Sequence, residues 1–175
     1  DKLCLINGMH ADAPVHPQCF VQLHTGNFQF VRPSVGAWVS YGLGTENQNL
    51  PGFVTIKPPT RVGGAQNYGS AFMPAVYQGT AVGNLNTNIQ DASIGNLSNK
   101  SLSSELQRKQ IDLIQSMNRN LRQEKPSDQR IDGVIKSYEL AYRMQTSVPG
   151  VVNFDKETEA TKKLYGFDQK ETRTF

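Results

Sequence analysis

Cysteine, long apolar runs and tracts of like charge are all scarce in this chain of 175 residues. No apolar run approaches the roughly 18 residues that a membrane-spanning helix needs, and no positively charged leader opens the chain. The 18 Lys and Arg exceed the 15 Asp and Glu by three, and this surplus is spread along the sequence. Without a basic stripe that could follow phosphates, nucleic acid is a poor candidate partner.

The two cysteines, Cys4 and Cys19, are too few to define a framework. A disulfide, two buried thiols and a coincidental pair are all compatible with their spacing. Two buried thiols are favoured, because Cys is among the residue types most often buried. The cellular compartment therefore cannot be read from them.

The rest of the composition suits one globular unit. Hydrophobic residues make up 37% of the chain and aromatics 9%, while 15 Gly and 9 Pro indicate long loops. The chain starts within an apolar stretch and without an initiator Met. We therefore expect an internal fragment of a longer protein.

The first third of the chain predicts alternating strands and helices. Residues 3–6 and 50–56 are apolar runs typical of buried strands. A helix is expected to begin near Pro17 and to end at Gly26, and Ser34 is expected to cap a second helix. This pattern predicts an α/β sandwich with parallel strands and flanking helices.

The second helix is predicted to be amphipathic and to end at Gly42 or Gly44. Gly36 within it is expected to allow close packing. Its apolar face is expected to be formed by Val35, Trp38 and Val39, with Tyr41 and Leu43 as further candidates.

The remainder divides near residue 100. Residues 57–100 lack periodicity and predict a long loop, either a functional insertion or a segment laid over the surface by its aromatics. Ser103 and Ser127 are expected to open two helices that form a long hairpin, with Pro126 between them. Asp155 is expected to cap a third helix, which should run to residues 164–165 and end at Gly166. We expect residues 1–175 to be an incomplete part of one domain, with a strand-loop-helix core portion at 1–60, a long surface loop at 61–100 and a helical segment at 101–166.

A loop after the first predicted strand holds the best local candidates for chemistry, His10, Asp12 and His16. Imidazole and carboxylate suit zinc and similar ions, although the spacing matches no tight ligand motif. The alternative is that Asp12 turns the loop and the histidines make local hydrogen bonds. His24 is a weaker candidate for contact with a ligand or substrate. No Ser or Cys can be tied to a His and an orienting acid, so no nucleophile is assigned.

Several stretches carry a resemblance to a known family. They are MHAD at 9–12 followed by His16, LHTG at 23–26, RPSVGAWVSYGLG at 32–44, NLPGFV at 49–54, FMPAVYQG at 72–79, QRKQ at 107–110, SYELAYRMQ at 137–145 and LYG at 164–166. They resemble a sulfatase-like domain-of-unknown-function family of exported bacterial proteins, within the alkaline phosphatase superfamily.

The resemblance implies a partial sulfatase-like sandwich and a divalent metal, zinc, calcium or similar, whose ligands lie mostly outside this fragment. A metal pair of that kind stabilises the attacking and leaving oxygens of a displacement. Alignment on Thr25 and Gly26 places His16 at the nucleophile position and Phe20 where sulfatases have Arg. That departure argues against a formylglycine-type sulfatase.

The resemblance further predicts that the full-length protein hydrolyses a sulfate or phosphate ester, on a small-molecule or polysaccharide substrate. His16 would be catalytic, and His10, Asp12 and His24 would bind substrate, while the fragment alone would be inactive. The protein would be exported to the periplasm or the exterior. The alternative is a non-catalytic binding or structural module on the same scaffold.

Overall fold

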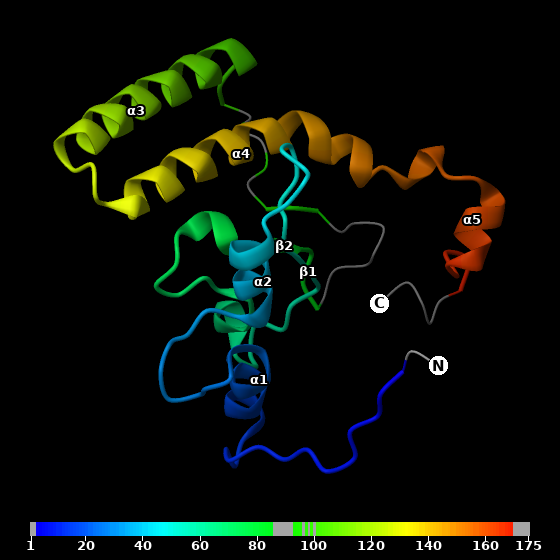
Figure 1. The fold of residues 1–175 in the computed structure, drawn as a ribbon. Coiled ribbons are helices and arrows are strands. Elements are labelled where there is room, and N and C mark those ends of the chain that lie inside the picture. Colours follow the sequence, from blue (N-terminus) through cyan, green and yellow to red (C-terminus); the bar gives the residue numbers. More distant parts are fainter. Residues whose placement is uncertain (1–2, 86–92, 96, 98, 100, 170–175) are drawn as a thin grey trace.

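The computed structural model describes residues 3–85, 93–95, 97, 99 and 101–169, as a mixed α/β fold (Figure 1). A lower part holds the first two helices and a small sheet, and a long helical hairpin crosses above it. In chain order the elements are α1 (His16–Thr25), α2 (Val35–Leu43), β1 (Val54–Ile56), η1 (Gly64–Tyr68), η2 (Ala75–Tyr77), β2 (Thr80–Val82), α3 (Ser104–Glu124), α4 (Gln129–Val151), η4 (Phe154–Lys156) and α5 (Glu159–Leu164).

Local signals position the first two helices as expected. Pro17 lies in the first turn of α1, where its missing N–H costs no hydrogen bond, and Gly26 ends the helix at a φ of 75°. Ser34 caps α2 by accepting a hydrogen bond from the Ala37 N–H at 3.3 Å. The predictions of both helices are confirmed.

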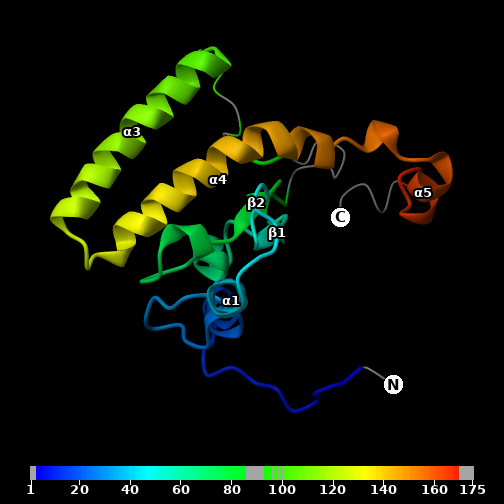
Figure 2. The same cartoon turned by 45° about the horizontal axis from the view of Figure 1, so that its top comes forward.

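The first predicted strand does not form. Residues 3–6 have no regular structure, and Leu3 is 95% exposed. Figure 2 shows this segment running in extended form below α1, away from the sheet. A strand requires a partner for its backbone hydrogen bonds, and none lies beside this segment in the described chain. The expected strand-helix-strand unit is therefore wrong.

The sheet that does form has two parallel strands. Val54 pairs with Thr80 and Ile56 with Val82, and the Thr80 N–H donates to the Phe53 carbonyl at 2.9 Å. Strand β2 lies within residues 57–100, where only irregular structure was expected. The structure thus supports the parallel pairing, but it does not show the predicted sandwich.

The helical hairpin of α3 and α4 is present, with one change in its capping. Ser103 caps α3 as predicted, whereas Asp128, and not Ser127, caps α4. Asp128 accepts a hydrogen bond from the Arg130 N–H at 3.1 Å and also pairs with the Arg130 guanidinium. A carboxylate at the start of a helix is stabilised by the helix dipole as well as by these bonds.

A buried polar side chain joins the two helices. Gln115 of α3 is 1% exposed, and its Nε2 donates to the Ile135 carbonyl at 2.8 Å and to Glu139 at 3.1 Å. Arg108 pairs with Glu139 at 3.4 Å and also lies over the Tyr142 ring at 4.8 Å. These contacts fix how far one helix is shifted along the other, because sliding would leave buried polar groups unpaired.

The third helix of the C-terminal region begins later than expected. Thr158 caps α5, whereas Asp155 lies inside η4, which is capped by Asn153. Gly166 follows α5 with a φ of 69°, in agreement with its predicted role as a helix stop.

The apolar face of α2 is exposed, contrary to expectation. The exposed side chains are Val35, Trp38, Val39, Tyr41 and Leu43, while Ala37 alone in this helix is buried. The helix instead packs through Gly36, where an added Cβ would overlap the Phe53 ring. This confirms that Gly36 allows close packing. No helix within the described residues is long and apolar enough to span a bilayer.

Candidate functional site

The loop that holds His10 and Asp12, just before α1, is open to solvent. His10 Nε2 lies 3.9 Å from Asp12 Oδ1, with these side chains 85% and 76% exposed. Asp12 also accepts a hydrogen bond from Gln22 of α1 at 3.4 Å. The contacts are long and solvated, so they contribute little to stability.

The two other histidines belong to opposite ends of α1. His16 is the first residue of the helix and His24 lies in its last turn, where its ring is 6.4 Å from that of Phe20. Eight residues of helix separate them by about 12 Å along the axis. Within the described ranges no group of three His, Cys, Asp or Glu side chains converges as a metal site would require. The roles predicted for these residues stay predictions.

The favoured interpretation of the two cysteines is wrong. Cys4 is exposed and Cys19 only half-buried, and both are free thiols. The Cys19 Sγ donates to the Ala13 carbonyl at 3.2 Å. Cys4 loses its burial because the strand expected around it does not form.

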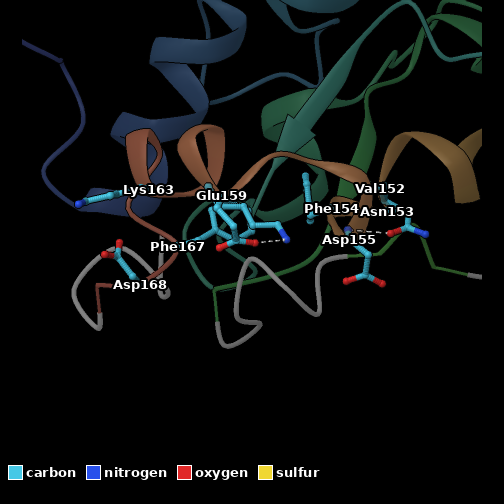
Figure 3. Close-up of a pocket in the computed structure, with 9 residues that line it drawn as sticks. Val152, Asn153, Phe154, Asp155, Glu159, Lys163, Phe167 and Asp168 are labelled. Carbon is cyan, nitrogen blue, oxygen red and sulfur yellow. Dashed lines mark hydrogen bonds and ion pairs between the residues drawn. The ribbon is translucent and has the colours of Figure 1, made fainter.

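One hollow lies between η4 and α5, with a volume of about 810 Å³ (Figure 3). Phe154 and Phe167 meet edge to face at 5.3 Å, and Lys162 pairs with Glu159 at 3.1 Å. Figure 3 shows Asp155 and Asp168 far apart, at opposite ends of the drawn group. The hollow between η4 and α5 is lined by both acidic and basic side chains that do not converge on one point. We therefore assign no ligand to it.

A second hollow, smaller than the one between η4 and α5, is a more specific candidate for a ligand site, and we call it the cationic pocket. It has a volume of about 280 Å³ and lies between the loop after α2 and the middle of α4. Its lining is formed by Ser40, Gly44, Thr45, Asn47, Gln48, Leu50, Gly52, Val76, Tyr77, Lys136, Leu140 and Arg143.

Close backbone contacts build the walls of the cationic pocket. An added Cβ at Gly133 of α4 would overlap Pro74, so α4 lies directly against the start of η2. In the opposite wall, Asn47 Oδ1 accepts hydrogen bonds from the N–H groups of Asn49 and Leu50, at 2.8 and 3.0 Å. Asn47 thus orders its own loop with its oxygen and keeps its amide N–H donors for other partners.

Charge distinguishes the cationic pocket. Lys136 and Arg143 lie seven residues apart on α4, which is about two turns, so they share a face of the helix. Within the described chain neither forms a salt bridge, and no acidic residue is part of the lining. Glu139, the closest acid along α4 to Arg143, is paired with Arg108. Hydrogen bonding from Gln115 holds the pKa of Glu139 below its ordinary value, and the charge of Arg143 also helps to hold it there. The two cations are therefore available to an anion.

The sequence analysis missed Lys136 and Arg143. Their spacing on one helix, with Leu140 between them, was a usable signal. For the facing wall of the pocket, the usable signal was the concentration of Thr, Asn and Gln in residues 45–49. What the sequence did not reveal was that these two segments, about 90 positions apart, line one cavity.

Comparison with known proteins identifies a family. The family model described as "Protein of unknown function (DUF1501)" matches residues 1–175. The chain belongs to this family. No curated protein and no solved structure matches the chain.

This match corrects the resemblance drawn from the sequence motifs. It supports membership of a family of unknown function, and it does not tie the chain to sulfatases or to the alkaline phosphatase superfamily. The assignment to a sulfatase-like family was therefore wrong. Motifs such as LHTG at 23–26 also have simple structural roles here, since Gly26 ends α1.

Proposed function

We propose that this chain is a binding module that holds a small anionic, hydroxyl-rich ligand, a sulfated or phosphorylated monosaccharide, in the cationic pocket. The observation that carries the proposal is the pair Lys136 and Arg143, which line a cavity with no acidic residue in its described lining. Guanidinium and ammonium groups recognise sulfate and phosphate through charge-assisted hydrogen bonds.

The rest of the lining supports recognition of a sugar. Ser40, Thr45, Asn47 and Gln48 offer hydroxyl and amide groups, while Tyr77 offers an aromatic ring. A volume of about 280 Å³ is near the lower end of ordinary ligand pockets, roughly 300 Å³, and suits a single sugar ring. Binding by such an open site is expected to be weak and to decrease with salt.

The test compares galactose 6-sulfate with galactose by isothermal titration calorimetry at low salt. Arg143→Gln should weaken binding of the sulfated sugar by roughly 5- to 30-fold, because one charge-assisted contact contributes about 1–2 kcal/mol. Arg119→Gln is the matched control, since Arg119 is exposed and lies outside the pocket lining. Equal affinity of the two sugars, or equal loss in the two variants, would exclude the proposal.

Metal-dependent hydrolysis of sulfate or phosphate esters by the full-length protein stays a prediction, as do the metal and export. The described residues give no observation that favours it over binding. Metal analysis with an assay on aryl sulfate and aryl phosphate esters tests it. Unchanged turnover in a His16→Ala variant would remove the role predicted for that residue.

A further inference from the structure

Four aromatic side chains form a continuous line that starts at the cationic pocket, and we call it the aromatic row. Its members in spatial order are Tyr77, Tyr41, Trp38 and Phe72. Ring centroids are separated by 5.3 Å between Tyr77 and Tyr41, 6.3 Å between Tyr41 and Trp38, and 6.1 Å between Trp38 and Phe72. The row thus joins three segments of the chain: α2, the loop before η2, and η2 itself.

The aromatic row is open to solvent and yet ordered. Tyr41 is 56% exposed, Trp38 47% and Phe72 66%. All three neighbouring pairs meet edge to face, which is a favoured geometry for aromatic rings. Mutual contacts of this kind restrict the side chains before a ligand arrives, so binding loses less conformational entropy. A contiguous exposed aromatic surface is also a common mark of an interaction site.

The aromatic row and the cationic pocket are continuous through one residue. Tyr77 lines the pocket and contacts Tyr41, the next member of the row. The two cations therefore lie at one end of the row, and no described cation lies over any of its rings, since the cation–π contact in the described chain joins Arg108 and Tyr142.

We propose that the aromatic row extends the cationic pocket into a site for an anionic oligosaccharide, whose charged terminal sugar occupies the pocket while the following sugars lie on the row. This inference rests on the proposed function. Sugar rings have apolar faces and polar edges, so they match exposed aromatic rings that begin at a pocket lined by hydroxyl and amide groups. The charge at one end fixes the direction of the chain, and the row adds affinity with length.

The position of the charges favours this ligand over nucleic acid. Single-stranded nucleic acid also stacks on aromatic side chains, but it carries a phosphate at each nucleotide and needs cations along its whole path. Here the two cations of the pocket lie at the Tyr77 end, and within the described chain no cation lies over a ring of the row. A second copy of this chain would cover the exposed apolar residues of α2, and the test below includes that occupant as an outcome.

The single tryptophan of the chain makes the proposal directly measurable, because Trp38 reports on the row itself. We would titrate the purified protein with galactose 6-sulfate and with a disaccharide, tetrasaccharide and hexasaccharide of galactose that each carry one sulfate, on the terminal sugar. The expected result is at least a tenfold gain in affinity from disaccharide to hexasaccharide. Trp38 emission should shift to the blue with the hexasaccharide and remain unchanged with galactose 6-sulfate.

Variants separate the row from the pocket. Phe72→Ala should remove most of the gain with length, while the affinity for galactose 6-sulfate stays at the wild-type value. Phe30→Ala is the matched control, because Phe30 is equally exposed at 63% and lies outside the row. Arg143→Gln should instead weaken every sulfated ligand by the same factor.

Each failure has a distinct meaning. Equal affinity across the length series, with galactose 6-sulfate still bound, overturns the aromatic row and leaves the proposed function intact. If galactose 6-sulfate does not bind but affinity still rises with oligosaccharide length in a Phe72-dependent way, the proposed function of the pocket fails and the aromatic row stands. Tighter binding of an oligothymidylate hexamer than of the hexasaccharide overturns the inference in favour of nucleic acid. Concentration-dependent dimerisation that Phe72→Ala abolishes overturns it in favour of a second copy.

Discussion

Helix α2 and the hairpin of α3 and α4 form their contacts in opposite ways. Helix α2 approaches its neighbours through its smallest residues, Gly36 against the Phe53 ring and Ala37 in the interior. The hairpin instead buries Gln115, a long polar side chain that spans both helices. In both regions large apolar side chains remain exposed, such as Leu43 and Leu113. An amphipathic pattern therefore identified the helices correctly, but it did not identify Ala37 and Gln115 as side chains that they bury.

The largest change in stability is expected where Gly36 of α2 packs against the Phe53 ring. Gly36→Ala should destabilise the fold by about 1–3 kcal/mol, because the new Cβ overlaps the Phe53 ring. Gly42→Ala in the same helix should be neutral or stabilise by up to about 1 kcal/mol, because nothing lies within 4 Å of its Cβ position. Urea unfolding of the two variants measures the difference. Equal effects would show that α2 does not pack through Gly36.

The next largest change in stability is expected from loss of the hydrogen bonds that Gln115 donates between α3 and α4. Gln115→Ala should lower the free energy of unfolding by about 2 kcal/mol, since it removes two interhelical hydrogen bonds and leaves a cavity. Gln110→Ala on the exposed side of α3 should change it by less than about 0.5 kcal/mol. If the two variants unfold at the same urea concentration, the hairpin is held by other contacts.

A smaller effect is expected at the start of α2. Ser34→Ala removes the side chain that accepts from the Ala37 N–H and should cost about 1 kcal/mol. Ser34→Asp would keep an acceptor but place a carboxylate at a buried position, so Ser34→Thr is the better matched control. Thermal unfolding should rank the wild type and Ser34→Thr above Ser34→Ala. A stable Ser34→Ala variant would make the cap dispensable.

The smallest effect concerns pH. Hydrogen bonding from Gln115, together with Arg108, holds the pKa of Glu139 below its ordinary value of 4.5. A carboxyl group with a depressed folded-state pKa stabilises the fold above its unfolded pKa, and this stability is lost as the pH falls through the folded value. The advantage of wild type over Glu139→Gln should thus shrink on acidification below about pH 4.5.

The exposed fraction of the Glu139 side chain sets the expected size of the pH effect, and an exposed glutamate provides the control. The Glu139 side chain is 32% exposed, so the difference at neutral pH should be under about 1 kcal/mol. Glu124→Gln, at an exposed position at the end of α3, should follow the wild-type pH profile. A constant difference between wild type and Glu139→Gln from pH 7 to pH 3 would contradict the prediction.

Elements were predicted best where the deciding contacts lie within one helical turn. Gly26 ends α1, Ser34 caps α2 and Ser103 caps α3, because each cap acts on backbone groups two to four residues away. The strand at residues 3–6 failed and β2 was missed, because a strand forms only when distant residues supply its hydrogen bonds.

Candidate functional residues were predicted less well than helix ends. His10, Asp12 and His16 are close in sequence, and His10 and Asp12 do lie near each other, but they remain solvated and form no metal-ligand group in the described chain. Lys136 and Arg143 form a candidate site only because the loop after α2 lines the same cavity. Proximity in sequence was thus a poor guide to a site built from segments far apart.

By itself the sequence determined where α1, α2 and α3 begin and end, and that α3 and α4 pair as a hairpin, because caps, glycines and a short connection act locally. Only the tertiary structure decided which residues are buried, since burial depends on what faces each side chain. It also decided that Tyr77 joins a cationic pocket to an aromatic row. The physical reason is that such contacts join residues dozens of positions apart, which no local pattern encodes.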